Sequence, residues 1–598
     1  MSRRAARLFG GWVGELSRET LRADLMAGLL GALLVLPQGI AFASLAGLPP
    51  QIGLTTAVLP AVIAALFGSS RHVATGPSNA TSLALAAMLA PLAVAGSASY
   101  IELAFAVTLL VGVLQTAVGA LRLGGIANFI SPAALLGFTT GAALLIALHA
   151  LPDLLGVTVD AHGSAAFLAA LAQQLELAKP GPLLVGGVTL AAAVAVRRLQ
   201  PRWPAMLIAL AAGTLLASAL PPGEAWRVAQ VGQVPAPLPM LHWPAVDASR
   251  WFELMGLALP LALVALAQSI SIAKVIGARS GQRIDANREF LGQGLANLVG
   301  GLTSSYIACG SMNRSLPNYE AGARTPLASV FAAVLLLALA LASAPLLALI
   351  PLASIAALLL LVAFNLLELP QWRRLARLER SDLAIAAATA LATITLRIEI
   401  AILLGSILSL GTYLLRTSKP AMRTMGFDSS DPNRPFVVVD GRSPADGALP
   451  ECPQLKLLRM EGAVYFGAVA HVSDHLAALR AAPDAPKHLL VMSKSMNFID
   501  LAAAQMWDEE LQRRRAMGGD LHFHRPRPPV VDLWRRTGFL EALGPGHVHA
   551  DKRSAIATIV PRLDAAICAR CRVRVFFECA DQPGASDQPS VLLSAPAP

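Results

Sequence analysis

Apolar runs of about 20 residues recur along the first two thirds of this chain, and no other feature restricts its fold as strongly. A helix needs about 20 mostly apolar residues to span the hydrocarbon core of a bilayer. Fourteen such segments, several of them short, lie between residues 24 and 415 of the 598. The chain is 55% hydrophobic and only 14% charged, and its mean hydropathy is +0.60. These values exclude a soluble globular protein and predict an α-helical membrane protein.

The basic residues between the segments indicate the orientation. Cytoplasmic loops retain Lys and Arg, and with the N-terminus inside, most basic residues of the loops fall on the cytoplasmic side. An even number of crossings returns the C-terminus to that side. We therefore expect a multi-pass protein of the cytoplasmic (inner) membrane with both termini in the cytoplasm. The segments are expected at 24–42, 52–68, 76–92, 102–120, 127–149, 182–199, 203–220, 252–273, 288–303, 311–322, 326–344, 350–367, 382–396 and 400–415.

The net charge of +10 follows from these loops, so nucleic acid is not an expected partner. Beyond residue 416 the composition changes to strand-like runs that alternate with amphipathic helices, which predicts a small cytoplasmic α/β domain. We expect strands at 436–440, 455–460 and 488–492, and helices at 468–481 and 501–517. The expected parts are a cytoplasmic N-terminal segment (1–23), a transmembrane domain (24–416), the α/β domain (435–562) and a disordered tail (580–598).

Two of the apolar segments begin with matching polar interruptions. Residues 75–82 read Thr-Gly-Pro-Ser-Asn-Ala-Thr-Ser, and residues 309–315 read Cys-Gly-Ser-Met-Asn-Arg-Ser. In transporters, a pair of broken segments in corresponding halves indicates the substrate site. Helix N-termini expose unpaired N–H groups and a positive dipole end, so they attract anions. Half-helices that start near Gly76 and Ser311 could hold an anion between their ends.

Arg314 is the only charged residue in either interruption. An arginine at membrane depth costs about 2.5 to 3.5 kcal/mol on insertion scales, and it marks a transport pathway or an internal partner. We interpret Arg314 as part of the anion site. The alternative is a structural residue that snorkels to the surface or forms an ion pair.

Several longer stretches resemble the SulP family of anion permeases. They are residues 21–28, 36–50, 67–72, 281–301, 310–316 and 319–326, while residues 496–501 resemble the STAS domain that these permeases carry. The resemblance implies two inverted repeats of seven segments, a core domain that carries the substrate and a gate domain that anchors it. It also implies a homodimer and movement of the core against the gate.

By the same resemblance, Gln38 and Phe42 line the pocket opposite Ser78 and Asn313. Taken alone, Phe42 would be a packing residue and Gln38 would form an interhelical hydrogen bond. Many relatives carry a carboxylate at the position of Gln268, whose amide cannot titrate, so coupling to H⁺ or Na⁺ is not expected there. The expected substrate-binding residues are Gln38, Phe42, Thr75, Gly76, Ser78, Gln268, Ser311, Met312, Asn313 and Arg314.

The leading hypothesis is therefore a secondary transporter that moves an inorganic or small organic anion by elevator-like alternating access. Sulfate is the first candidate for that anion. An uncoupled exchanger or channel-like conductance for chloride or bicarbonate, and a dicarboxylate carrier, are alternatives. Two further alternatives are a membrane sensor or scaffold, whose cytoplasmic domain would carry the function, and a nucleobase permease of related architecture. We find no arrangement of catalytic residues and expect neither an enzyme nor a cofactor.

Smaller signals in the sequence carry less weight. Cys568, Cys571 and Cys579 are interpreted as a reduced thiol cluster, because one Cys-x-x-Cys pair and a distant cysteine are incomplete as a metal site. Residues 292–297 (Gly-Gln-Gly-Leu-Ala-Asn) are interpreted as helix packing. Asp500 is followed by Leu501 and three alanines, without a hydroxyl to phosphorylate. The cytoplasmic domain is therefore expected to support assembly or to bind a cytoplasmic protein partner.

Overall fold

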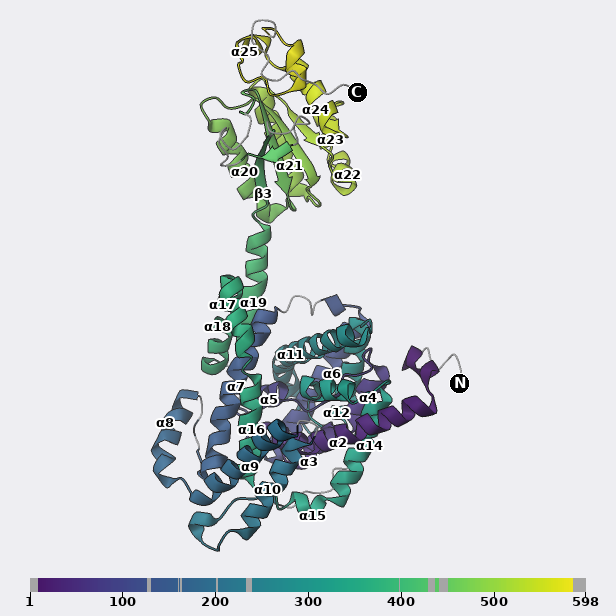
Figure 1. The fold of residues 1–598 in the computed structure, drawn as a ribbon, viewed down its shortest axis with the longest axis vertical. Helices are drawn as coiled ribbons and strands as arrows, with labels where there is room; N and C mark the ends of the chain where they lie inside the picture. The colour runs from purple at the N-terminus through teal and green to yellow at the C-terminus, as the bar shows by residue number, and fades with distance from the viewer. Residues whose placement is uncertain are drawn as a thin grey trace. The chain divides into compact units, whose positions relative to one another are not determined.

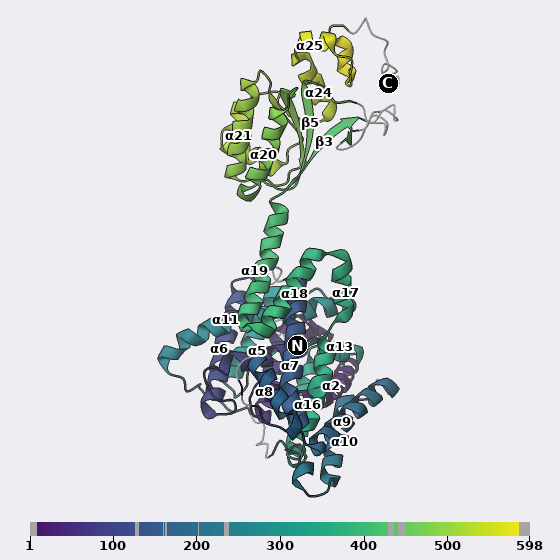
Figure 2. The ribbon, with the colours of Figure 1, turned by 90° about the vertical axis from the view of Figure 1, so that its left-hand side faces the viewer.

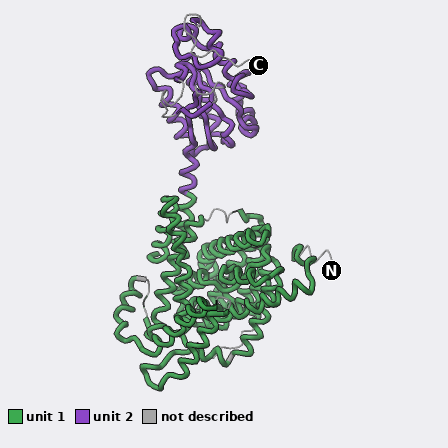
Figure 3. The backbone as a smooth tube through the Cα atoms, viewed as in Figure 1, with its two compact units in different colours: residues 1–410 green, residues 411–598 purple. Residues whose placement is uncertain are grey.

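The computed structural model describes residues 9–125, 131–159, 161, 164–200, 203–232, 239–396, 398–427, 436–439 and 450–584 (Figure 1). The chain divides into two compact units, residues 1–410 and residues 411–598, coloured green and purple in Figure 3. Residues 585–598, most of the tail that was expected to be disordered, lie outside the described residues.

The first unit is helical, and several of its long helices, among them α2, α6 and α7, begin at side-chain caps. The α2 helix starts at a capping box in which Ser17 and Thr20 exchange hydrogen bonds between side chain and backbone, at 2.8 and 3.1 Å, which satisfies two otherwise unpaired N–H groups. The elements of this unit are α2 (Arg18–Leu45), α3 (Pro50–Thr56), α4 (Leu59–Phe67), β1 (Thr75–Gly76), α5 (Asn79–Leu89), α6 (Ala98–Ala120), α7 (Pro132–Leu155), α8 (Ser164–Gln174), α9 (Pro180–Leu199), α10 (Ala205–Ala219), α11 (Ala248–Ser280), α12 (Ala286–Gly301), β2 (Cys309–Gly310), α13 (Met312–Glu320), α14 (Leu327–Ala342), α15 (Ala344–Leu347), α16 (Leu352–Leu366), α17 (Leu369–Leu378), α18 (Arg380–Thr395) and α19 (Ile398–Thr417), which continues into the second unit.

Each of the fourteen predicted apolar segments overlaps a helix or a pair of helices. Among the described residues, seven helical stretches are long and apolar enough to cross a membrane. Several others, such as α5 and α10, are apolar but shorter. The helical membrane architecture is therefore present, while the number of crossings stays a prediction. The α17 helix was not predicted as a helix, because its Arg373, Arg374 and Arg377 favoured a loop.

The helices sort into two groups by their contacts. In the first bundle, α12 packs on α6 and α4, α14 packs on α2, and α11 packs on α5, α6 and α13. In the second bundle, α7 packs on α16 and α18, and α9 packs on α10 and α16. The bundles touch mainly where α2 meets α10 and α16 and where α5 meets α7. Figure 2 shows the same unit from the side.

Glycines bring α6 and α12 unusually close. A Cβ atom added to Gly112 would lie 2.3 Å from the Leu298 nitrogen, and one added to Gly294 would lie 2.4 Å from the Thr116 nitrogen. Small residues of this kind let membrane helices pack backbone to backbone. Residues 292–297 thus contribute to helix packing, as interpreted from the sequence.

The second unit contains a six-stranded sheet of order β4-β3-β5-β6-β7-β8. The β5–β6, β6–β7 and β7–β8 pairs are parallel, and β3 pairs antiparallel with both β4 and β5. Successive residues of a strand point to opposite faces, so Leu458 and Leu489 enter one core while Leu457 and Leu490 enter the other. The elements are β3 (Ala421–Phe427), β4 (Phe436–Val438), β5 (Leu455–Glu461), α20 (Phe466–Ala481), β6 (His488–Ser495), α21 (Leu501–Ala516), β7 (Leu521–His524), α22 (Pro528–Arg536), α23 (Phe539–Leu543), β8 (Val548–His549), α24 (Lys552–Ile559) and α25 (Ala565–Arg570).

The predicted strands and helices of this unit all have counterparts, but the sheet is larger than expected. The β3 strand lies ahead of residue 435, where the domain was expected to begin, and α25 lies beyond residue 562. β7 and β8 were missed as well. β8 has two residues, and so short an element shows no period in the sequence.

Candidate functional site

The two polar interruptions meet in the first unit. β1 pairs antiparallel with β2, so that Thr75 lies opposite Gly310 and Gly76 opposite Cys309. Each strand leads directly into a helix, β1 into α5 and β2 into α13. Because the strands are antiparallel, the helices leave in opposite directions and their N-termini lie beside one another. The expected juxtaposition of two half-helix ends is present.

The first turn of α5 and the N-cap residues of both helices are buried. Ser78 is the N-cap of α5, and its hydroxyl accepts a hydrogen bond from the Thr81 N–H at 3.4 Å. Ser311 is the N-cap of α13, but its side chain makes no capping bond. The first turn of α13 therefore keeps backbone N–H groups that a ligand can use.

Side chains that the sequence interpretation did not include hold the crossing in place. Ser269 on α11 accepts the Gly310 N–H at 2.9 Å, and Ser315 accepts the Ala74 N–H at 2.9 Å. Gln293 on α12 donates to the Thr75 hydroxyl at 2.8 Å. Asn297, one turn further, donates to the Ala308 carbonyl and accepts the Ala308 N–H. These contacts orient both interruptions.

A polar stripe at helical spacing could have revealed part of this support. Glu289, Gln293 and Asn297 are four residues apart and share one face of α12. All three are buried, and the Glu289 carboxylate accepts the N–H groups of Ser69 and Ser70 at 2.9 and 3.0 Å. The glycines between them suggested packing alone, and that interpretation hid the polar face.

Arg314 is 3% exposed and lies beside the crossing. Its guanidinium rests against Gly76, at which an added Cβ would lie 3.1 Å from Nη1. Within the described part of the chain, Nε, Nη1 and Nη2 have no hydrogen-bond partner. Snorkelling and ion pairing, the two structural interpretations of Arg314, do not describe this arrangement. The side chain is a buried cation with unused donors.

A small cavity borders the guanidinium. It has a volume of 30 Å³, room for about two water molecules. Thr75, Arg314, Asn318 and Ser329 supply its polar lining, and apolar residues, mostly of α2, α4 and α14, supply the rest. Of the ten predicted site residues, Thr75 and Arg314 line this cavity, and Gly76 contacts Arg314.

The other predicted residues lie in different surroundings. Ser78 and Gln268 both contact the Cys309 thiol, with sulfur–oxygen distances of 3.1 and 3.6 Å. Gln38 is buried on α2 and its amide donates to the Met206 sulfur of α10 at 3.8 Å. Phe42 is buried in the main apolar core, as its packing interpretation expects.

The remaining three belong to the start of α13. Ser311 is buried, Met312 is half-buried and Asn313 is exposed. Asn313 therefore does not share the buried surroundings of Ser78. The predicted residues therefore fall into two groups near the β1–β2 pair. One group lines the cavity beside Arg314, and the other consists of Ser78 and Gln268, which contact the Cys309 thiol.

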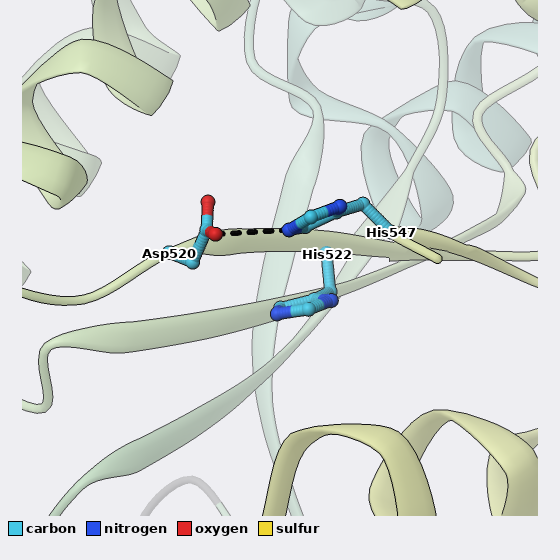
Figure 4. A group of neighbouring side chains, drawn as sticks. All are labelled: Asp520, His522 and His547. Atoms are coloured by element: carbon cyan, nitrogen blue, oxygen red, sulfur yellow. Dashed lines mark hydrogen bonds and ion pairs between the residues drawn. The ribbon is translucent and has the colours of Figure 1, made fainter. Parts of the chain in front are cut away.

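A second polar cluster lies in the second unit and consists of Asp520, His522 and His547 (Figure 4). The Asp520 carboxylate lies 2.9 Å from the His547 Nε2. The His522 ring stacks on His547 with ring centres 4.6 Å apart. Burial is the main cause that lowers the pKa of His522 to about 3, so the ring is neutral at physiological pH. The potential ligand atoms of the three residues lie within 4.8 Å of one another. A metal ion bound there would have to replace the Asp520–His547 hydrogen bond.

Broken helices that meet at a buried cation inside a membrane-type bundle define a transporter. Residues 21–389 match the sulfate permease family, and residues 448–555 match the STAS domain. The chain belongs to the sulfate permease family of membrane anion transporters and is not an enzyme. The resemblance that the sequence motifs suggested is thereby confirmed.

Relatives share most of the chain. A probable sulfate transporter of Mycobacterium tuberculosis is 33% identical over 413 residues, which cover 69% of this chain and 74% of that protein. The chloroplastic sulfate transporter 4.1 of Arabidopsis thaliana is 27% identical over 558 residues, 88% of this chain and 78% of that protein.

Solved structures share the fold. The murine anion transporter Slc26a9 in its inward-facing state superposes with a TM-score of 0.84 at 19% identity, covering 92% of this chain and 93% of that one. The transmembrane domain of the cyanobacterial bicarbonate transporter BicA gives a TM-score of 0.58 at 25% identity, covering 66% of this chain and 99% of that one. The fold is thus helical with a C-terminal STAS domain.

Proposed function

We propose that this protein is a secondary transporter that moves a small anion across the cytoplasmic membrane, with sulfate as the first candidate substrate. The buried Arg314 guanidinium carries the proposal, because its three nitrogens have no partner within the described residues and the N-termini of α5 and α13 lie beside it. An unpaired buried charge is costly. An anion at this place would neutralise the charge and use the free N–H groups of α13. The sulfate transporters among the relatives support this choice of substrate.

In this proposal, Thr75, Gly76, Ser311, Met312 and Arg314 surround the anion, which accepts hydrogen bonds from the guanidinium and from N–H groups in the first turn of α13. The Ser311 N–H is already used, because it donates to the Ala74 carbonyl at 3.2 Å. Gln38, Phe42, Ser78, Gln268 and Asn313 line the route by which it arrives. For Asn313, exposure is consistent with a position at the mouth of that route. The 30 Å³ cavity is too small for a tetrahedral oxyanion, so binding requires α13 and α14 to separate from α2 and α4.

The two bundles suggest how the site gains access to both sides of the membrane. We infer that the first bundle is the core domain and the second is the gate domain, and that the core moves like an elevator against the gate. The sparse contacts between them, at α2 and α5, support a sliding boundary. We also propose that the chain crosses the membrane fourteen times in two inverted repeats, forms a homodimer, and has both termini in the cytoplasm.

The alternative is an uncoupled exchanger or a channel-like conductance for chloride or bicarbonate, and Gln268 favours it. The amide of Gln268 accepts a hydrogen bond from Cys309 beside the helix ends and cannot carry a proton in exchange. The bicarbonate transport named for BicA supports bicarbonate as the anion. A dicarboxylate would need a larger opening beside Arg314.

Uptake of labelled sulfate into proteoliposomes tests both versions. We expect Arg314→Ala to reduce uptake at least tenfold and Arg314→Lys to retain part of it, whereas Arg279→Ala, which removes an exposed cation of α11, should leave it unchanged. Competition by bicarbonate, chloride, succinate and uracil ranks the substrates. Uptake driven by an imposed H⁺ or Na⁺ gradient would contradict the uncoupled version. Normal uptake by Arg314→Ala would remove Arg314 from the anion site, and no uptake by the wild-type protein would favour a sensor or scaffold.

A further inference from the structure

Four of the five cysteines of the chain come together in the second unit. Cys452, Cys568, Cys571 and Cys579 line a single cavity with Gln454 and Arg574. Cys452 precedes β5, while the other three lie in and around α25. All are free thiols. The fold thus adds a fourth thiol to the three that the sequence placed near one another, and all four line one cavity, although their sulfur atoms are not gathered as closely as the potential ligand atoms of the Asp520 cluster.

The sulfur atoms are surrounded by hydrogen-bond donors. The Gln454 side chain donates to the Cys568 sulfur at 3.3 Å, and the backbone amides of Gln454 and Leu455 bond to the Cys452 sulfur. The Phe576 backbone amide does the same for Cys579. Donors aimed at sulfur stabilise thiolates, and such outer contacts accompany thiolate ligands of metals. A purely apolar thiol core would not need them.

Arg574 adds a positive charge to this surrounding. Its guanidinium donates to the Cys579 carbonyl at 2.7 Å and to the Cys568 carbonyl at 3.2 Å, so it fixes the two cysteine-bearing segments together. Its Nε is buried and has no partner within the described part of the chain. A nearby thiolate could accept that N–H, and the guanidinium would offset negative charge on the sulfurs.

The cavity has the size of a single ion. Its volume is 20 Å³, about what one water molecule occupies, which excludes a cluster of several irons or an organic ligand.

We propose that Cys452, Cys568, Cys571 and Cys579 bind one Zn²⁺ ion as four thiolates. Zinc takes four cysteines in closed, tetrahedral structural sites, and each thiol releases its proton on binding. The ion would fasten the region of α25 and Cys579, which has little regular structure of its own, to the start of β5. The site has no open position and serves the fold of the cytoplasmic unit, independently of transport.

Metal analysis of the full-length protein tests the proposal. The protein is purified in detergent without chelator, freed of its affinity tag, incubated with a slight excess of Zn²⁺ and desalted, and zinc is measured by mass spectrometry. We expect one zinc per chain, and less than a tenth of that for Cys452→Ser and for Cys571→Ser. Cys309→Ser, which removes the thiol of the first unit, should keep the full zinc content.

Three results would overturn the proposal. One is wild-type protein without zinc after incubation. Another is zinc that remains in Cys452→Ser and disappears in His522→Gln, which would place the ion at the Asp520 cluster. The third comes from cobalt replacement in the wild-type protein, which needs no folded variant. Bound Co²⁺ should show thiolate-to-metal charge-transfer absorption, and one bound cobalt without that absorption would exclude a cysteine site.

Discussion

The guanidinium of Arg314 lies against the backbone of Gly76, although the two residues belong to different halves of the chain. An added Cβ at Gly76 would be 3.1 Å from Nη1 and 3.4 Å from both Cζ and Nη2. The glycine also has a φ of +152°, which residues with a side chain rarely adopt. The absence of a side chain at position 76 therefore sets where the cation lies.

Gly76→Ala should impair transport without unfolding the protein. The methyl group would push the guanidinium away from the helix ends and strain the backbone, so we expect sulfate uptake to fall roughly tenfold. Gly187→Ala is the matched control, because nothing lies within 4 Å of an added Cβ there. Uptake in proteoliposomes and the melting temperature in detergent would be compared. Unchanged uptake by Gly76→Ala would show that the position of Arg314 is not critical.

Gln268→Glu should introduce a pH dependence that the wild-type protein lacks. The new carboxyl group would lie beside the Cys309 thiol and could carry a proton, so uptake should respond to an imposed proton gradient. Gln268→Leu removes hydrogen bonding without adding a titrating group and serves as the control. If wild-type uptake already follows the proton gradient, another residue performs the coupling.

Glu510→Ala should destabilise the second unit far more than Glu509→Ala. Glu510 and Arg514 are 2% and 0% exposed, and the carboxylate accepts Arg514 Nε at 2.7 Å and also pairs with Arg480. Removing one partner of a buried pair costs about 3–5 kcal/mol. Glu509 pairs with Arg513 at 3.1 Å while both are more than half exposed, and such pairs contribute about 0–1 kcal/mol. Protease accessibility of the second unit in increasing urea would measure the difference, and equal effects would contradict the buried pair.

Acid should destabilise the second unit through His522. Burial lowers the folded-state pKa of His522 to about 3, while the unfolded state titrates near 6.5. Between these values the unfolded chain binds a proton that the folded chain does not, so stability falls as the pH falls from about 6.5, by up to about 1.4 kcal/mol per pH unit. His522→Phe should reduce that slope in urea titrations at pH 7, 6 and 5. The exposed His471→Phe is the control, and equal slopes for both variants would assign the effect elsewhere.

The sequence predicted those parts of the structure that rest on length and composition. Membrane helices need long apolar runs, so their positions followed directly, as did the two polar interruptions around Gly76 and Ser311. β1 and β2 have two residues each, too few for any pattern. The sequence did not predict that Cys452 lies near Cys568. Their proximity depends on the folded sheet, because β5 brings the preceding residue Cys452 next to α25. The support from Ser269 and Ser315 depends likewise on helix contacts that no local signal reports.

The pairing of Thr75–Gly76 with Cys309–Gly310 also has a consequence for how the protein is made. The first interruption enters the membrane early in synthesis and must wait for α11, α12 and α13 before it has a partner. Until then, a chain with most of its helices inserted has no place for the anion. A partly made chain therefore lacks the proposed anion site, which is completed only when the second half of the bundle supplies Cys309 and Gly310.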